Sequence, residues 1–182
     1  RVRLGPLLAI LLLPGIAASQ DLEAARELYA SGQIEEATRA FRVAGGELAA
    51  TDPEGAAAAL NNACVLATRL GQLELAREDC LRALELRREL SDLRGQARTS
   101  NNLALVEQTL GNYDGAEELY RAARRLNREI EDAEAEAINL LNLGVVANLR
   151  GRYGDALALY REAESLAASR GAEPGAAPQG VG

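Results

Sequence analysis

The chain has 182 residues, enough for one domain of moderate size, and is 48% hydrophobic but only 3% aromatic. Its formal net charge is −7, with 27 acidic against 20 basic residues, which argues against a nucleic-acid-binding surface. Histidine, the commonest general base and metal ligand, is absent, and no glycine-rich phosphate-binding motif occurs. We therefore expect no enzymatic activity, no cofactor and no metal site.

The first residues, 1–19, predict a secretory signal peptide. Two arginines precede an apolar run at residues 7–13, and small residues follow it. A membrane-spanning helix needs about 20 apolar residues, more than this run provides. We expect cleavage after Ala18 or Ser19 and a mature protein that is periplasmic or secreted. The alternative is a protein anchored to the membrane by an uncleaved N-terminal segment.

A repeat of 40 residues organises the rest of the chain. Three copies carry a glycine at the same point, and a fainter first copy has its glycine 39 residues earlier; these are Gly32, Gly71, Gly111 and Gly151. A repeat of this length predicts a solenoid of stacked units. We expect a divergent first unit at 20–54 and further units at 55–94, 95–134 and 135–170.

Each unit is predicted to contain two helices. Residues 97–110 carry apolar side chains at helical spacing and contain no Pro or Gly, and Gly111 then ends the helix. A second helix begins at Tyr113, with Ala116 and Ala123 on its apolar face. The aromatic residues that recur at fixed positions are expected in the core; these are Tyr113 with Tyr153, and Phe41 with Tyr120 and Tyr160.

These positions closely resemble the tetratricopeptide repeat over about residues 21–170. The resemblance is clearest in the segment 110–114 followed by Ala116, Tyr120 and Ala123. The family's usual period is about 34 residues, and six further residues here lengthen the second helix and its exit loop. The resemblance implies an all-α fold, a right-handed superhelix of stacked antiparallel helical hairpins.

The resemblance also implies a non-catalytic scaffold that binds a peptide or a partner protein in a concave groove. The alternative is an N-terminal sensory or docking segment of a larger signalling or protease protein. Neither a nucleic acid nor a small-molecule substrate is expected as a partner.

The end of the chain, residues 171–182, is predicted to be a disordered tail or the start of a truncated repeat. Ala177 continues the 40-residue series of Ala57, Ala97 and Ala137, but no polar capping helix follows. Self-association through this uncapped repeat is therefore a further expectation.

In the family, the first helix of each hairpin lines the groove. The corresponding candidates here are Asn61, Asn62, Arg98, Asn101, Asn102, Leu105, Gln108, Asn142, Val145 and Asn148. The most regular feature is the column Asn62, Asn102 and Asn142. An amide has donors and acceptors that could pair with the backbone of an extended peptide. The same amides could instead satisfy polar groups of the adjacent repeat, and the sequence leaves both roles open.

Two cysteines occupy positions that hold a small and an aromatic residue in the other units, so Cys64 and Cys80 should face each other across a hairpin. In an oxidising compartment they could form a disulfide. The alternative is two buried thiols, because a position sized for an aromatic ring could hold the Cβ atoms too far apart.

Overall fold

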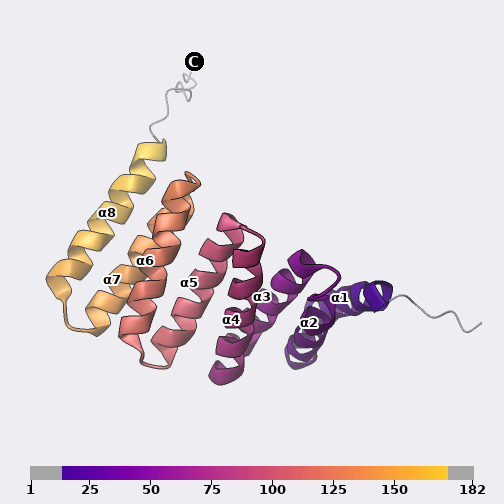
Figure 1. The fold of residues 1–182 in the computed structure, drawn as a ribbon. Coiled ribbons are helices and arrows are strands. Elements are labelled where there is room, and N and C mark those ends of the chain that lie inside the picture. The colour runs from indigo at the N-terminus through magenta and orange to yellow at the C-terminus, as the bar shows by residue number, and fades with distance from the viewer. Residues whose placement is uncertain (1–13, 172–182) are drawn as a thin grey trace, which may run out of the picture.

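Residues 14–171 are described by a computed structural model as eight α-helices, without a strand (Figure 1). The four hairpins are α1 (Pro14–Ala30) with α2 (Ile34–Leu48), α3 (Pro53–Arg69) with α4 (Leu73–Glu89), α5 (Leu93–Thr109) with α6 (Tyr113–Glu129), and α7 (Ala133–Leu149) with α8 (Tyr153–Gly171). The expected all-α solenoid of stacked antiparallel hairpins is confirmed.

Two kinds of turn alternate along the chain. Within a hairpin the turn passes through a glycine of positive φ, as at Gly71 (72°) and Gly111 (83°), a conformation that other residues rarely adopt. Between hairpins the side chains of Asp52, Asp92 and Asp132 each accept a hydrogen bond from the backbone N–H three residues later, at 2.9, 2.9 and 3.1 Å. These caps start the next helix two residues before each of the predicted unit boundaries.

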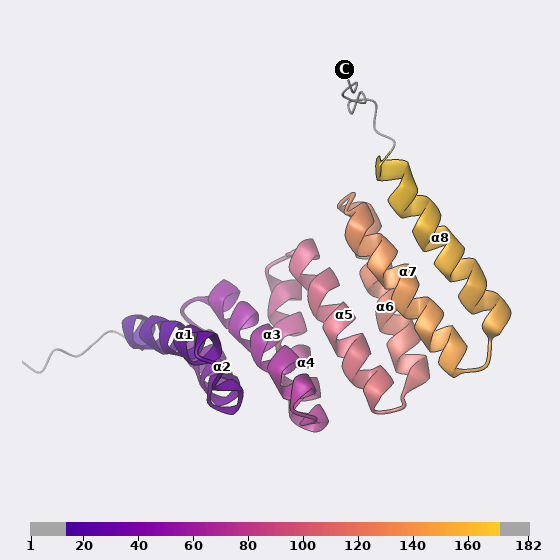
Figure 2. The same ribbon diagram turned by 180° about the vertical axis from the view of Figure 1, so that it is seen from behind.

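The helices form two layers, with α1, α3, α5 and α7 in the first and α2, α4, α6 and α8 in the second (Figures 1 and 2). Within one layer, the contact between α3 and α5 of the first layer is the most extensive. It places the first layer on the inner, concave side of the array at this junction. We call the exposed side chains of its four helices the inner face.

Small side chains let the layers approach closely. Ala76, Ala116 and Ala156 occupy equivalent positions of three hairpins and are all buried. Among the aromatic residues, Tyr120 is buried as predicted, but Tyr153 is 70% exposed and the prediction of a core position for it is wrong. The equivalent Tyr113 packs against a buried cluster that includes Leu143 and Val146 of α7. Within the part of the chain that the structure describes, no hairpin follows α8 to cover Tyr153 in the same way.

A disulfide joins Cys64 of α3 to Cys80 of α4, and both residues are fully buried. In the fourth hairpin the same positions hold Gly144 and Tyr160, which are so close that a Cβ on Gly144 would lie 2.3 Å from Tyr160 Cε1. The two positions therefore meet across each hairpin. Two cysteines placed there lie within bonding reach, with their Cα atoms 5.3 Å apart.

The structure describes only part of the N-terminal and C-terminal segments. The apolar run at 7–13, predicted as the centre of a signal peptide, lies outside the described residues. So does the predicted tail at 171–182 except for Gly171, which ends α8. Residues 14–19, the end of the predicted signal peptide, begin α1. Among the helices of residues 14–171, none combines the length and the apolar character that crossing a membrane requires.

Reducing the disulfide should lower the free energy of unfolding by about 3 kcal/mol, because it closes a loop of 16 residues. Thiol labelling of the denatured protein should find no free thiol before reduction and two after it. The midpoint of urea unfolding should fall once reduction is complete. The double variant Cys64→Ala/Cys80→Ala is the control, since its unfolding should not respond to reductant. An unchanged midpoint in fully reduced wild-type protein would contradict the stabilising role.

Candidate functional site

Apolar side chains are exposed in register along the inner face. Val65, Leu105 and Val145 occupy the same position of α3, α5 and α7, and they are 37%, 44% and 38% exposed. Single exposed apolar side chains are ordinary on protein surfaces. A column that recurs at the same position of three successive hairpins is a regular apolar feature of the inner face, and it is a candidate interaction surface.

Asparagine side chains beside this column join the second hairpin to the third and the third to the fourth. Asn61 Oδ1 of α3 accepts a hydrogen bond from Asn102 Nδ2 of α5 at 3.0 Å. One repeat later, Asn101 Oδ1 accepts hydrogen bonds from Asn139 Nδ2 and Asn142 Nδ2 of α7, each at 3.0 Å. Asn102 and Asn142, two of the three residues in the asparagine column, thus bridge adjacent repeats.

The bridging amides also keep polar atoms that a ligand could reach. Asn102 and Asn142 use only their Nδ2 atoms in these bonds. Within residues 14–171, the buried side-chain polar atoms that lack a partner are Arg87 Nε and Arg152 Nε, so the remaining Oδ1 atoms of the two half-buried asparagines are not fully buried. Asn62, the third member of the column, is exposed and has no side-chain hydrogen bond within that range.

Two clefts lie on the inner face. The first cleft, between α1 and α3, has a volume of about 180 Å³ and is lined by Tyr29, Phe41, Asn62, Val65, Leu66 and Arg69. The second cleft, between α5 and α7, has about 200 Å³ and is lined by Arg94, Ala97, Arg98, Asn101, Asn127, Asp132, Ala135, Ile138 and Asn139. Pockets that enclose a small-molecule ligand are usually about 300–1,000 Å³. Each cleft therefore suits one or two side chains of a longer ligand.

The remaining candidates from the sequence have different surroundings. Arg98 is exposed and lines the second cleft. Asn148 is exposed near the end of α7. Gln108 is half-buried, and its Oε1 accepts a hydrogen bond from the hydroxyl of Tyr120 at 3.4 Å. Gln108 therefore contacts the interior of its own hairpin.

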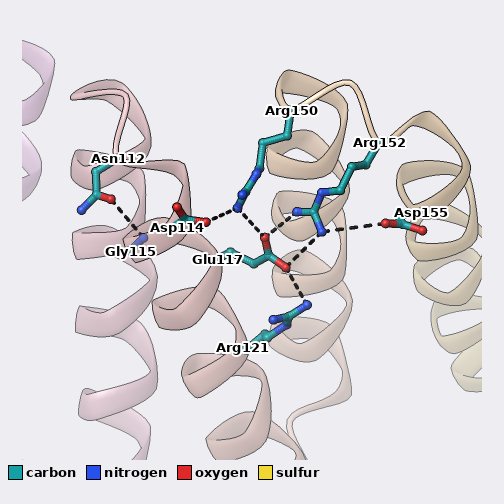
Figure 3. A network of polar contacts seen from close by, with 8 residues as sticks. All are labelled: Asn112, Asp114, Gly115, Glu117, Arg121, Arg150, Arg152 and Asp155. Atoms are coloured by element: carbon teal, nitrogen blue, oxygen red, sulfur yellow. Dashed lines mark hydrogen bonds and ion pairs between the residues drawn. The ribbon is translucent and has the colours of Figure 1, made fainter.

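An ion-pair cluster links the third and fourth hairpins (Figure 3). The buried Glu117 of α6 pairs with Arg121 of the same helix at 2.5 Å and with Arg150 and Arg152, on the turn before α8, at 3.1 and 2.5 Å. Asp114 and Asp155 complete the cluster. A cleft of about 400 Å³ lies beside it, but three arginines face three carboxylates. The charges compensate one another, so the cluster connects repeats and does not form an anion site.

The arginines of this junction change the titration of the glutamates they surround. Burial by itself raises the pKa of Glu117, but the hydrogen bond from Arg152 and the charges of its arginine partners bring that pKa below the ordinary 4.5. Glu136 of α7 is similar. Burial opposes the effect there too, and hydrogen bonds from Arg128 and Arg124 of α6 lower the pKa of Glu136.

The sequence profile of the tetratricopeptide repeat matches residues 55–129 and, overlapping them, 95–169. The chain belongs to the tetratricopeptide repeat family. No curated protein matches the chain significantly. Within residues 14–171 of this tetratricopeptide repeat protein, no group of three or more His, Cys, Asp or Glu side chains is placed to hold a metal ion.

Several solved structures share the fold of this tetratricopeptide repeat protein. BtubC (BKLC) from P. vanneervenii is 18% identical with a TM-score of 0.81, and the match covers 96% of this chain and 72% of BtubC. The apo form of RapI is 16% identical with a TM-score of 0.78, covering 87% of this chain and 45% of RapI. The Rap conjugation gene regulator of plasmid pLS20, solved with the Phr* peptide, is 16% identical with a TM-score of 0.66, covering 90% and 48%. The chain thus spans less than half of either Rap protein.

Replacing Asn101 by alanine should destabilise the protein by about 1–3 kcal/mol, because the Nδ2 atoms of Asn139 and Asn142 lose their shared acceptor and Asn139 is buried. Urea unfolding measures the change. Asn62→Ala is the matched control. Its free energy of unfolding should stay within about 0.5 kcal/mol of the wild-type value, since Asn62 is exposed and has no side-chain hydrogen bond within residues 14–171. Equal losses in the two variants would show that the amide bridges do not stabilise the array.

The lowered pKa values of Glu117 and Glu136 predict acid sensitivity of the junction between α6 and α7–α8. Each carboxylate contributes stability in full above the unfolded-state pKa of about 4.5, and this is lost as the pH falls through the lower folded-state pKa. Glu117→Gln should therefore lose less stability between pH 7 and acid pH than wild type. Glu118→Gln, on an exposed neighbour in α6, should keep the wild-type profile. Parallel profiles for wild type and Glu117→Gln would exclude the ion-pair cluster as the cause.

Proposed function

We propose that this tetratricopeptide repeat protein is a non-catalytic scaffold that binds an extended peptide segment of a partner protein on its inner face. The observation that carries the proposal is the aligned column Val65, Leu105 and Val145, with the exposed Asn62 and the half-buried Asn102 and Asn142 beside it. The amides supply donors and acceptors for a peptide backbone, and the apolar column supplies contacts for its side chains. The Rap conjugation gene regulator, which has a similar fold, was solved in complex with the Phr* peptide, and this supports a peptide as the ligand.

The size of the apolar column indicates how much more of the inner face the ligand must contact. Fully burying one such side chain is worth about 1.5–3 kcal/mol, and these three are already more than half buried. Completing their burial would supply only about 3 kcal/mol in total, less than the cost of association of about 4–15 kcal/mol. A ligand that binds here must therefore also use the two clefts and the amides, which favours a segment several residues long.

We also propose that the protein acts in an oxidising compartment outside the cytoplasm. Stable disulfides are rare in cytosolic proteins of mesophiles, and here a buried disulfide joins Cys64 to Cys80. The apolar run at 7–13 with small residues after it supports the same location. The mass of the protein recovered from cells should lack the first 18 or 19 residues. A full-length, cytosolic protein with two free thiols would overturn this proposal.

Selection from a displayed library of random peptides tests the scaffold function. Wild-type protein should enrich peptides, and Leu105→Glu should weaken their binding about tenfold or more, because a carboxylate would interrupt the apolar column. Leu81→Glu is the control, since Leu81 is equally exposed but lies on the second-layer helix α4. It should bind as wild type does. If no peptide is enriched, or if both variants lose binding equally, the inner face is not the binding surface.

A further inference from the structure

We propose that the α7–α8 end of the array is a second docking surface, and that it binds a basic amphipathic helix of a partner protein. We call Leu141 of α7 with Tyr153, Leu157 and Glu164 of α8 the end surface. It adjoins the inner face at Leu141 but lies mainly on α8, so the proposal goes beyond the proposed function. It is carried by a comparison of the end surface with the two preceding junctions between hairpins.

The preceding junction shows how side chains at these positions are covered. Tyr113 of α6 packs against a buried cluster that includes Leu143 and Val146 of α7. At the end of the array in Figure 1, the equivalent Tyr153 of α8 is 70% exposed and Leu157 is 49% exposed. A helix that lay against α8 as α7 lies against α6 would cover both side chains.

The first difference from the preceding junctions is the loss of an amide. Asn61 and Asn101 each accept hydrogen bonds from amides of the next first-layer helix. Leu141 holds the equivalent position in α7 and is 45% exposed. A hairpin like the internal ones would bury its amides against Leu141 without an acceptor, which is unfavourable. The helix that fits the end surface is therefore apolar at this point.

The second difference is the loss of a charge. Arg77 of α4 pairs with Glu107 of α5 at 2.7 Å. One repeat later, Glu117 of α6 pairs with Arg152 at 2.5 Å. The same position of α8 holds Leu157. The side chain that faces Leu157 is therefore apolar as well, and a row of apolar side chains along one side of a helix is what an amphipathic helix provides.

The third difference is a reversal of charge. Arg124 of α6 pairs with Glu136 and Glu162 of the next hairpin. Glu164 holds the same position in α8, is exposed, and forms no ion pair or hydrogen bond within residues 14–171. A ligand that neutralises Glu164 carries a Lys or Arg there. The net charge of −7 also attracts a basic ligand.

The exposed Arg161 of α8 does not cancel Glu164 for this ligand. Arg161 holds the position of Arg42, which pairs with Asp79 of the second-layer helix α4. A single helix in the place of a first-layer helix has no counterpart of Asp79. The charge of the end surface that such a helix meets is therefore that of Glu164.

A second copy of the chain fits this surface less well than a basic helix does. Stacked head to tail, it would bring α1 against α8. Helix α1 exposes Asp21, Glu23 and Glu27, and its single arginine, Arg26, is paired with Glu23 at 3.1 Å. It would therefore add negative charge beside Glu164, whereas a basic partner helix supplies the missing positive charge.

The test uses synthetic helical peptides of about 18 residues, long enough to form a helix, and fluorescence anisotropy to measure their binding to the protein. One peptide has Leu on one side of the helix and Lys beside it. A second peptide has Glu in place of Lys, and a third is a scrambled form of the first that breaks the spacing of the leucines. The Leu–Lys helix should bind at least tenfold more tightly than either of the others.

The apolar part of the end surface is tested by Tyr153→Ser/Leu157→Ser. This variant should bind the Leu–Lys helix about tenfold or more weakly, because two large apolar contacts are lost without a change of charge. Leu75→Ser/Leu81→Ser on α4 is the matched control, since these side chains are 40% and 50% exposed. It should bind as wild type does, and circular dichroism should show that both variants are folded.

The charge is tested by Glu164→Arg. It should weaken binding of the Leu–Lys helix and strengthen binding of the Leu–Glu helix, each about threefold or more, because the ion pair is replaced by repulsion. Glu85→Arg, on an exposed residue of α4, changes the net charge equally and should leave the preference for Lys unchanged. Equal binding of the two peptides to wild type, or an equal response of the two variants, would contradict the basic ligand.

Leu105→Glu separates this inference from the proposed function, because it alters the inner face and should retain the Leu–Lys helix. If Leu105→Glu loses the helix while Tyr153→Ser/Leu157→Ser keeps it, the inner face binds the helix and the end surface does not. If wild type without peptide forms a dimer in sedimentation that Tyr153→Ser/Leu157→Ser dissociates, the end surface binds a second copy and the inference is wrong. Binding of none of the peptides would overturn it too, and would leave the scaffold function to the library selection.

Discussion

The inner face keeps its shape because polar side chains set the register of each hairpin on the next. Hairpins in a solenoid contact only their neighbours, so a rotation at one junction displaces everything beyond it. Alanine-rich surfaces pack closely but would permit sliding. The hydrogen bond from Asn102 Nδ2 to Asn61 Oδ1 removes that freedom in the first layer. In the second layer Arg42 of α2 fixes the register against α4, because it donates hydrogen bonds to both carboxylate oxygens of Asp79. The nitrogen–oxygen distances are 2.7–2.9 Å.

The two layers therefore differ in the side chains that join adjacent hairpins: amides in the first layer and an ion pair in the second. Within the described residues, the second-layer helices α2, α4, α6 and α8 carry most of the exposed carboxylates. Inter-repeat ion pairs such as Arg124 of α6 with Glu136 of α7 connect this layer to the first one. The first-layer helices α3, α5 and α7 join one another mainly through side-chain amides, with one ion pair, Arg94 with Asp132, beside them. Composition averaged over the whole chain hides this segregation.

The features that recur with the 40-residue period were predictable, because equivalent residues have equivalent surroundings. The hairpins, the glycine turns and the burial of Ala116 and Tyr120 follow in this way. Features that break the period were not. Tyr153 has no following repeat to cover it within residues 14–171, and Arg150 and Arg152 occupy positions that hold Leu110 and Asn112 one repeat earlier. The role of the asparagine column was undecided because an amide satisfies a neighbouring repeat or a ligand with the same atoms.

The covalent bond between Cys64 and Cys80 also makes one hairpin more resistant to opening than its neighbours. Arrays of this kind open from their ends, since a terminal hairpin is packed on one side only. The bonded hairpin, α3 with α4, is the second of four and borders the first cleft, whereas the second cleft lies between α5 and α7. The bond keeps α3 against α4, so the α3 wall of the first cleft, which carries Asn62 and Val65, stays ordered even when a neighbouring hairpin moves away.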